Sequence, residues 1–167
     1  MKTDNLFNKE ALEKLQSMTE GIKVAMLLTN LKTVPINVNP MTTKKVDDKG
    51  AIWFLSPLNS DHNINIQTDN KVQLLYSDSD REQYLSVYGE ASVASHHNIL
   101  EELFTKEDNK WFNGFDDPNL TAIKIVPSEV YYWDKSQNKF ISMLEGTVEA
   151  VTGESKNHFK KGKIEVH

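Results

Sequence analysis

The sequence predicts a mainly β protein, an antiparallel barrel with short helices at its periphery. Six or seven short runs carry the apolar, β-branched and aromatic residues typical of strands. The connections between them are hairpin-like turns, whereas a parallel sheet would need regular helical crossovers. Helical spacing of apolar residues occurs only in short pieces. Closure of such strands into a barrel is a common solution, because it removes exposed sheet edges.

The first element is predicted to be an amphipathic helix near the N-terminus. Leu12, Leu15 and Met18 lie three residues apart and share one helical face. Asn5 or Asn8 precedes them as a candidate cap, and a glycine at position 21 is expected to end the helix.

The strands follow from apolar runs bounded by turn residues. Their predicted ranges are 23–29, 34–43, 51–55, 72–76 and 84–93, followed by two extended pieces, 120–126 and 129–133, around Pro127, with 140–144 as a further candidate. The second range contains Pro35 and Pro40, so we expect it at an edge, a bulge or the barrel rim, because proline donates no ladder hydrogen bond. Gly89 is expected to mark a bulge or bend.

Two further short helices are expected between these strands. Ile64 and Ile66 are the apolar positions of the first. The second is indicated by the spacing of His97, Leu100 and Leu103.

Composition favours one domain over residues 1–152, followed by a basic tail over 153–167 that we expect to be solvated. The chain has 167 residues, a net charge of −5 and no cysteine, which excludes disulfide frameworks and thiolate metal sites. Arg81 is the single arginine among 19 basic residues, so we expect no nucleic-acid partner. The first residues carry no apolar signal region and no run has the length of a membrane span, so we expect no membrane association and a cytoplasmic location.

The segment from Val38 to His62 carries the most chemical information. It predicts a β-hairpin around the turn at 47–50, followed at once by a helix start. Hydroxyls of Thr42 and Thr43 and the ammonium of Lys44 end the first strand, and Ser56 ends the second. Ser60 or Asp61 is expected to cap the helix. Together these groups predict a small anion site suited to a phosphate, although Lys44 taken alone is better interpreted as a solvated hairpin charge.

Several short motifs in fixed order connect this segment to the rest of the chain. They are Pro40-Met41, Trp53-Phe54-Leu55-Ser56, Ser60-Asp61-His62, Tyr84 to Ala91, Trp111 to Pro118, and Tyr132-Trp133-Asp134. From about Leu6 to Gly153, the chain resembles the pyridoxamine 5′-phosphate oxidase-like, FMN-binding split-barrel superfamily, and most closely its general stress protein branch. The resemblance implies an antiparallel split β-barrel, an FMN cofactor and a homodimer.

The resemblance also implies which residues contact the cofactor. The family places an arginine and a lysine at the positions of Asn39 and Lys44, and a lysine at the position of His62. The implied cofactor-binding residues are Asn39, Met41, Thr42, Thr43, Lys44, Leu55, Ser56, Ser60, His62, Tyr84 and Trp111. Tyr84 is alternatively an ordinary barrel tyrosine, and Trp111 with its neighbouring phenylalanines alternatively plugs one barrel mouth.

The function implied is that of an FMN-binding protein of the general stress type, a flavin-dependent oxidoreductase acting on a small-molecule substrate that the sequence does not identify. Two alternatives stay open. One is pyridoxamine 5′-phosphate oxidase, and the other is a non-catalytic barrel that has lost or weakened flavin binding. No catalytic acid or base and no metal ligand set is indicated.

Overall fold

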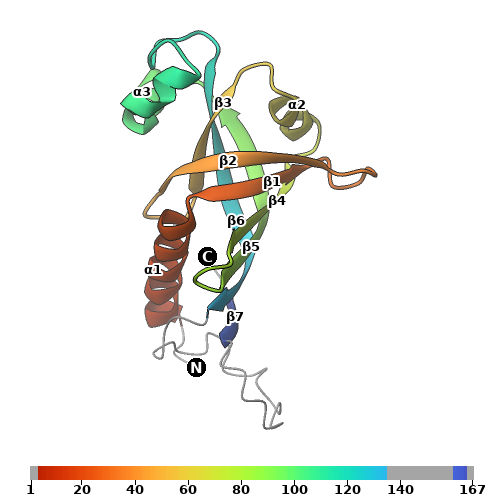
Figure 1. Cartoon of the computed structure of the whole chain (residues 1–167), viewed down its shortest axis with the longest axis vertical. Coiled ribbons are helices and arrows are strands. Elements are labelled where there is room, and N and C mark those ends of the chain that lie inside the picture. Colours follow the sequence, from red (N-terminus) through yellow and green to blue (C-terminus); the bar gives the residue numbers. More distant parts are fainter. Residues whose placement is uncertain (1–3, 135–159, 165–167) are drawn as a thin grey trace, which may run out of the picture.

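The computed structural model describes residues 4–134 and 160–164, and its centre is a closed antiparallel barrel (Figure 1). Six strands follow the order β3-β2-β1-β4-β5-β6, and pairing of β3 with β6 closes the ring. The strands are β1 (Val24–Thr29), β2 (Asn37–Val46), β3 (Ile52–Pro57), β4 (Lys71–Asp78), β5 (Gln83–Ala94), β6 (Leu120–Asp134) and β7 (Lys160–Ile164). The helices are α1 (Asp4–Ile22), α2 (Asp61–Thr68), α3 (His97–Leu103) and the 3₁₀ helix η1 (Lys106–Lys110). The predicted fold class is confirmed.

The core consists of two clusters of buried side chains. The larger fills the barrel with residues such as Leu27, Phe54 and Leu74, all fully buried. The smaller lies outside β3 and β6, where Trp53 and Ala122 pack beneath Leu100 and Leu103 of α3. Alternation of buried and exposed positions in β1 and β4 fits strands with one face toward a core.

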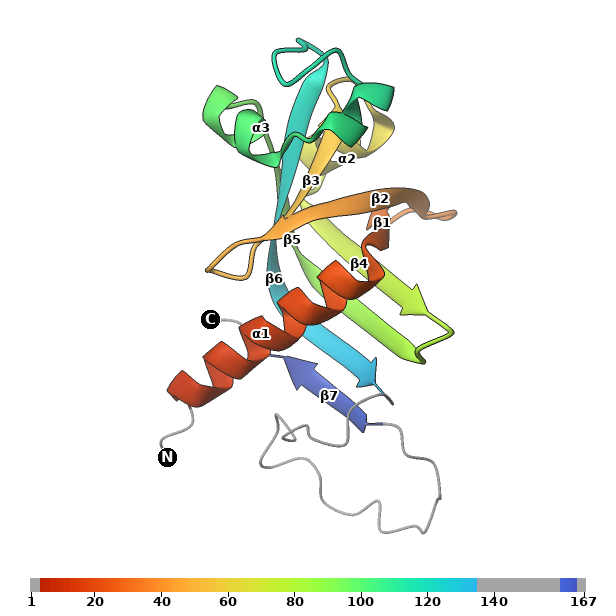
Figure 2. The same cartoon turned by 60° about the vertical axis from the view of Figure 1, so that its left-hand side comes forward.

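Helix α1 packs against β2 and β4 and crosses the barrel diagonally in the view of Figure 2. Ala11, Leu15 and Met18 are the face that enters the main core, with spacings of four and three residues. The helix runs one residue past the expected stop at Gly21, and Lys23 then adopts a left-handed φ of 66°. Lys14, 3% exposed, forms an ion pair with Asp134 at the end of β6 and thereby ties α1 to the barrel.

The prolines of the β2 region lie where a strand tolerates them, although the predicted range of 34–43 is displaced. Strand β2 starts at Asn37, so Pro35 belongs to the preceding turn. Pro40 lies in the half of β2 that pairs with β1, whereas pairing with β3 begins only at Thr43. An open edge at the proline and a bulge beyond it agree with the expectation for this strand.

Strand β6 is continuous through Pro127, so the two predicted pieces around this proline are wrong. The β5–β6 register shifts between Tyr88 and Gly89, and the shift leaves Ser128 unpaired beside Pro127. A Cβ on Gly89 would lie 2.2 Å from the carbonyl oxygen of Val126, so only glycine permits this close approach. The bulge expected at Gly89 is confirmed.

Beyond β6 the structure describes only β7, which pairs with Val130–Asp134 of β6. This strand lies within the segment expected to be a solvated tail, so five residues of that segment have regular structure. The predicted strand at 140–144 lies outside the described residues. Of the described helices, none has the length and apolar character needed to cross a membrane.

Candidate functional site

The candidate residues of β2 divide between the two faces of the strand. Asn39 lies opposite Leu27, and Met41, 8% exposed, belongs to the main core. Thr43 Oγ1 is 2.7 Å from the hydroxyl of Tyr76. Burial raises the pKa of Tyr76 above its ordinary value, although this hydrogen bond opposes the rise, so the phenol keeps its proton. Thr42 is exposed on the outer face, opposite Val24.

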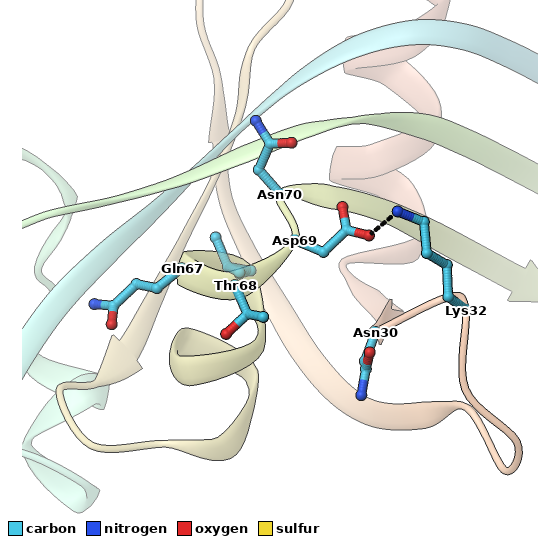
Figure 3. A pocket seen from close by; sticks show the side chains of 7 residues that line it. Asn30, Lys32, Gln67, Thr68, Asp69 and Asn70 are labelled. Atoms are coloured by element: carbon cyan, nitrogen blue, oxygen red, sulfur yellow. Dashed lines mark ion pairs between the residues drawn. The ribbon is translucent and has the colours of Figure 1, made fainter.

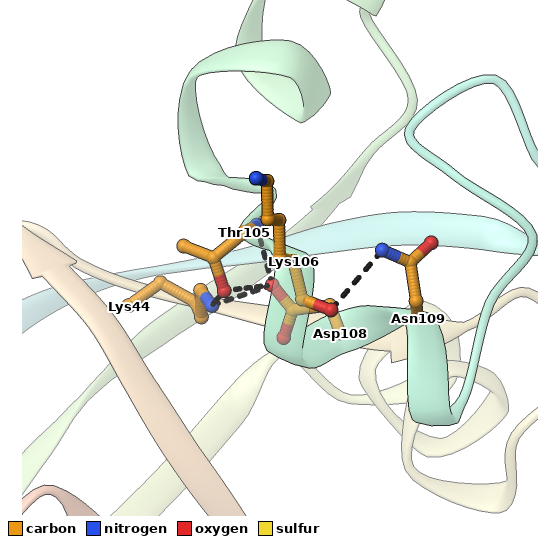
Figure 4. Close-up of polar contacts among 5 residues, drawn as sticks. All are labelled: Lys44, Thr105, Lys106, Asp108 and Asn109. Carbon is orange, nitrogen blue, oxygen red and sulfur yellow. Dashed lines mark hydrogen bonds and ion pairs between the residues drawn. The ribbon is translucent and has the colours of Figure 1, made fainter.

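Lys44 is the extra residue of a bulge, because Thr43 pairs with Phe54 and Lys45 already pairs with Trp53. Its ammonium lies 2.7 Å from Oδ2 of Asp108 and 3.2 Å from Oγ1 of Thr105 (Figure 4). A bulge changes the direction of a side chain, which explains how β2 reaches η1.

Asp108 is held as a carboxylate by several donors. Besides Lys44, its Oδ2 accepts hydrogen bonds from Thr105 N at 2.7 Å and Thr105 Oγ1 at 2.9 Å. Burial alone would raise the pKa of Asp108, but the bonds from Lys44 and Thr105 outweigh it and the pKa is lowered. The predicted phosphate cation therefore already has an anionic partner.

The turn from β3 to α2 is built on a buried polar network. Ser56 Oγ donates to Asn63 Oδ1 at 2.9 Å and lies 2.8 Å from Thr121 Oγ1. Asn63 Nδ2 donates to Thr121 Oγ1 and to the carbonyl oxygen of Pro57, each at 2.9 Å. All three polar side chains are at most 1% exposed. This network fixes α2 against the ends of β3 and β6.

Ser60 and His62 lie at the start of α2. Ser60, and not Asp61, is the cap, because its Oγ accepts from Asn63 N at 3.3 Å. His62 is only 7% exposed, and its buried Nε2 has no hydrogen-bond partner in the described part of the chain. Burial lowers the pKa of His62, with Asp61 opposing, so the imidazole is neutral near pH 7.

The remaining candidates lie apart from these groups. Leu55 is on the outer face of β3, against the smaller core. Tyr84 on β5 lies opposite Ser77 and Trp133. Trp111 is 80% exposed just after η1, whereas Phe112 is buried in the smaller core.

The structure thus brings the candidates together in two main groups. Lys44 joins η1, while Ser56, Ser60 and His62 line the β3–α2 turn, and α2 itself packs on β1 and β5. Sequence reasoning missed Asp108, Asn63 and Thr121. The pattern Thr105-x-x-Asp108 is that of a capping box and was a local signal for η1, but nothing local pointed to Lys44.

An outward row of apolar side chains crosses the sheet at β2, β1 and β4. Met26 lies opposite Pro40 on one side and Leu75 on the other. Met26 and Leu75 are each 41% exposed, and Val24 and Val38 nearby are 49% and 45% exposed. We call these five residues the outer apolar row.

An open hollow of about 560 Å³ lies elsewhere, between the β1–β2 connection and the end of α2 (Figure 3). Its lining is mostly polar, and Lys32 and Asp69 form an ion pair of 3.1 Å at its rim. None of the candidate residues lines it.

Residues 10–157 match the model of the family described as pyridoxamine 5′-phosphate oxidase like. The chain belongs to this family. General stress protein 26 of Bacillus subtilis (strain 168) is 25% identical over 60 residues, a match that spans 36% of this chain and 43% of that protein.

The solved structures that share the fold include two general stress proteins. General stress protein 26 from Bacillus anthracis (strain Sterne) has a TM-score of 0.64 at 22% identity, covering 72% of this chain and 92% of that one. The general stress FMN/FAD binding protein from Xanthomonas citri has a TM-score of 0.66 at 18% identity, covering 87% and 99%. Membership of the superfamily and its split-barrel fold, both predicted from the motifs, are confirmed.

Proposed function

We propose that this family member binds FMN and works as a homodimeric flavoprotein of the general stress type, with a flavin-dependent oxidoreductase activity on a small-molecule substrate. The observation that carries the proposal is the unpartnered Nε2 of His62 at the start of α2. Buried polar atoms are nearly always hydrogen-bonded, so an orphan of this kind needs a partner from outside the described chain. The FMN/FAD binding protein from Xanthomonas citri, which shares the fold, supports a flavin as that partner.

The donor types present fit the phosphate end of FMN. Ser60 brings a hydroxyl at a helix N-terminus and His62 a ring nitrogen, and Lys44 would supply the cation. The bound flavin would supply hydride or electron transfer at its ring system, and the protein would supply binding and orientation.

The outer apolar row supports the homodimer. Contiguous exposed apolar side chains on a sheet face are typical of interaction surfaces. A two-fold dimer buries the same patch on both copies, which suits a row of side chains that runs across several strands.

Of the two alternatives, a specific observation favours only the barrel with lost or weakened flavin binding. Lys44 is already paired with Asp108, and Asn39 contributes no charge. Pyridoxamine 5′-phosphate oxidase has no such support, because Arg81 is committed to Asp78 and to the carbonyl oxygen of Gly21, each at 2.6 Å.

Flavin titration of the purified full chain tests the proposal. We expect FMN fluorescence to be quenched and its visible absorption bands to shift at micromolar protein, and His62→Ala to weaken binding. A wild-type spectrum that equals the sum of free FMN and protein would overturn flavin binding and favour the lost-cofactor barrel. Circular dichroism of both proteins provides the folding control.

A further inference from the structure

We infer that Asp108 competes with the flavin phosphate for Lys44 and so sets the preference of the site between phosphorylated and unphosphorylated flavin. The inference rests on the proposed flavin site. Its starting point is the contact of Lys44 Nζ with Asp108 Oδ2 at 2.7 Å, within a pair whose side chains are 11% and 17% exposed.

Lys44 has limited capacity for a second anion. An ammonium group has three donors, and the structure directs it toward Asp108 and Thr105 (Figure 4). A phosphate that approached the same nitrogen would lie beside the carboxylate, and two like charges at one cation repel each other. A phosphate that binds Lys44 therefore competes with the Asp108 carboxylate for the ammonium.

Hydrogen bonds at the start of η1 hold the Asp108 carboxylate next to Lys44. Thr105 N and Oγ1 both donate to its Oδ2, and the pair forms the capping box of η1. Release of the carboxylate from Lys44 leaves these two bonds in place, so the competing group stays close to the cation after release. The lowered pKa of Asp108 keeps it ionised at neutral pH.

The neighbouring pair provides a matched comparison. Lys45 forms an ion pair with Glu102 of α3, but its side chains are 38% and 59% exposed. Exposed pairs contribute little because water and salt screen them. Neutralising Glu102 removes one acidic charge from the same region without freeing Lys44.

The test compares FMN with riboflavin, which has the same ring system without the phosphate. In Asp108→Asn the amide oxygen can still accept from Thr105, so the cap is retained while the charge is lost. We expect this variant to bind FMN roughly 10- to 100-fold more tightly than wild type, the range for one hydrogen bond between charged groups. Riboflavin affinity should change less than twofold, and Glu102→Gln should leave both affinities unchanged.

A second variant and a double substitution complete the design. Asp108→Gln places another capping side chain at the same helix position and should reproduce the gain if Asp108→Asn folds poorly. In Lys44→Met combined with Asp108→Asn the gain should disappear, because no ammonium remains to be freed.

The outcomes separate the inference from the proposed function. If wild type binds flavin and Asp108→Asn changes FMN and riboflavin alike, or neither, the competition is overturned while flavin binding stands. If no folded variant binds either flavin, the proposed function fails and the inference fails with it. Binding of FMN by Asp108→Asn alone would support both.

Discussion

His62 shows at the scale of one residue how burial decides what a polar side chain can do. On a short polar helix an imidazole is usually exposed and titrates near pH 6.5. Here the ring is 7% exposed and its pKa is lowered below that value. A protonated anchor for an anion is therefore not available at neutral pH, and Nε2 can offer a ligand only a neutral hydrogen bond.

The lowered pKa of His62 predicts a loss of stability in mild acid. Below the ordinary value of 6.5 the unfolded chain takes up a proton that folded His62 resists, so unfolding becomes more favourable as pH falls. The free energy of unfolding should decrease between pH 7.5 and 5.5, with a limiting slope of about 1.4 kcal/mol per pH unit from this group. Urea titrations at several pH values measure it.

His62→Gln should show a smaller decrease over the same pH range. The matched control is His97→Gln, because the side chain of His97 is 59% exposed and its ring lies at the surface beside Asp116. Equal slopes in wild type and His62→Gln would show that His62 titrates normally in the folded protein.

Side-chain chemistry was predictable from sequence where it depended on neighbours along the chain. Ser60 as a cap follows from its place before a helical segment, and the structure agrees. The partner of Lys44 is 64 residues away, so no local pattern contains it. The partner of Ser56 could not be predicted for the same reason, because Thr121 lies on β6.

At the scale of elements, the apolar runs predicted the central strands well, and the errors in strand boundaries lie next to prolines. The predicted ranges for β4 and β5 end within one or two residues of the observed strands, because buried and exposed positions alternate along most of both strands. The predicted range for β2 begins too early because it includes Pro35, and the predicted pieces of β6 lie within the observed strand but are wrongly divided at Pro127. The bulge that accommodates Pro127 depends on Gly89 across the ladder, which one strand alone does not reveal.

The β3–α2 connection predicts that loss of one side-chain amide, that of Asn63, strongly destabilises the fold. Asn63 is fully buried and bonds to Ser56, to Thr121 and to two backbone carbonyls. Replacing it with leucine removes these four hydrogen bonds from a fully buried site and leaves the Ser56 and Thr121 hydroxyls with only each other and the Ser56 carbonyl as partners. Each buried polar group that loses its bond costs about 1–3 kcal/mol. We expect Asn63→Leu to lower the free energy of unfolding by about 3 kcal/mol or more, measured by urea denaturation.

Asn65→Leu is the control on the same helix. Asn65 Nδ2 makes one side-chain bond, to Thr29 Oγ1 at 3.0 Å, so the loss should be about 1 kcal/mol. Equal losses for the two variants would contradict the assignment of Asn63 as the residue that fixes α2 to the barrel. Flavin affinity should fall with Asn63→Leu, because the start of α2 carries Ser60 and His62.

At the scale of the whole molecule, closure of the barrel leaves one question, which is what covers its outer face. β3–β6 pairing satisfies the ladder, and α3 covers the outside of β3 and β6 with the smaller core. The outer apolar row on β2, β1 and β4 has no such cover among the described residues. Successive residues of a strand point to opposite faces, so Leu27 and Leu74 fill the interior while Met26 and Leu75 point outward. These strands therefore have an apolar inner face and an apolar outer face.

The outer apolar row predicts that one charge on β1 dissociates the dimer. In Met26→Glu a carboxylate replaces the side chain between Pro40 and Leu75, and in a two-fold interface it would be buried on both copies. Burial of an unpaired charge is strongly unfavourable. Sedimentation at micromolar concentration should show wild type as a dimer and Met26→Glu as a folded monomer, whereas Ile64→Glu on α2, where the native side chain is 53% exposed, should remain dimeric. A wild-type monomer, or a dimer that persists in Met26→Glu, would exclude this face as the interface.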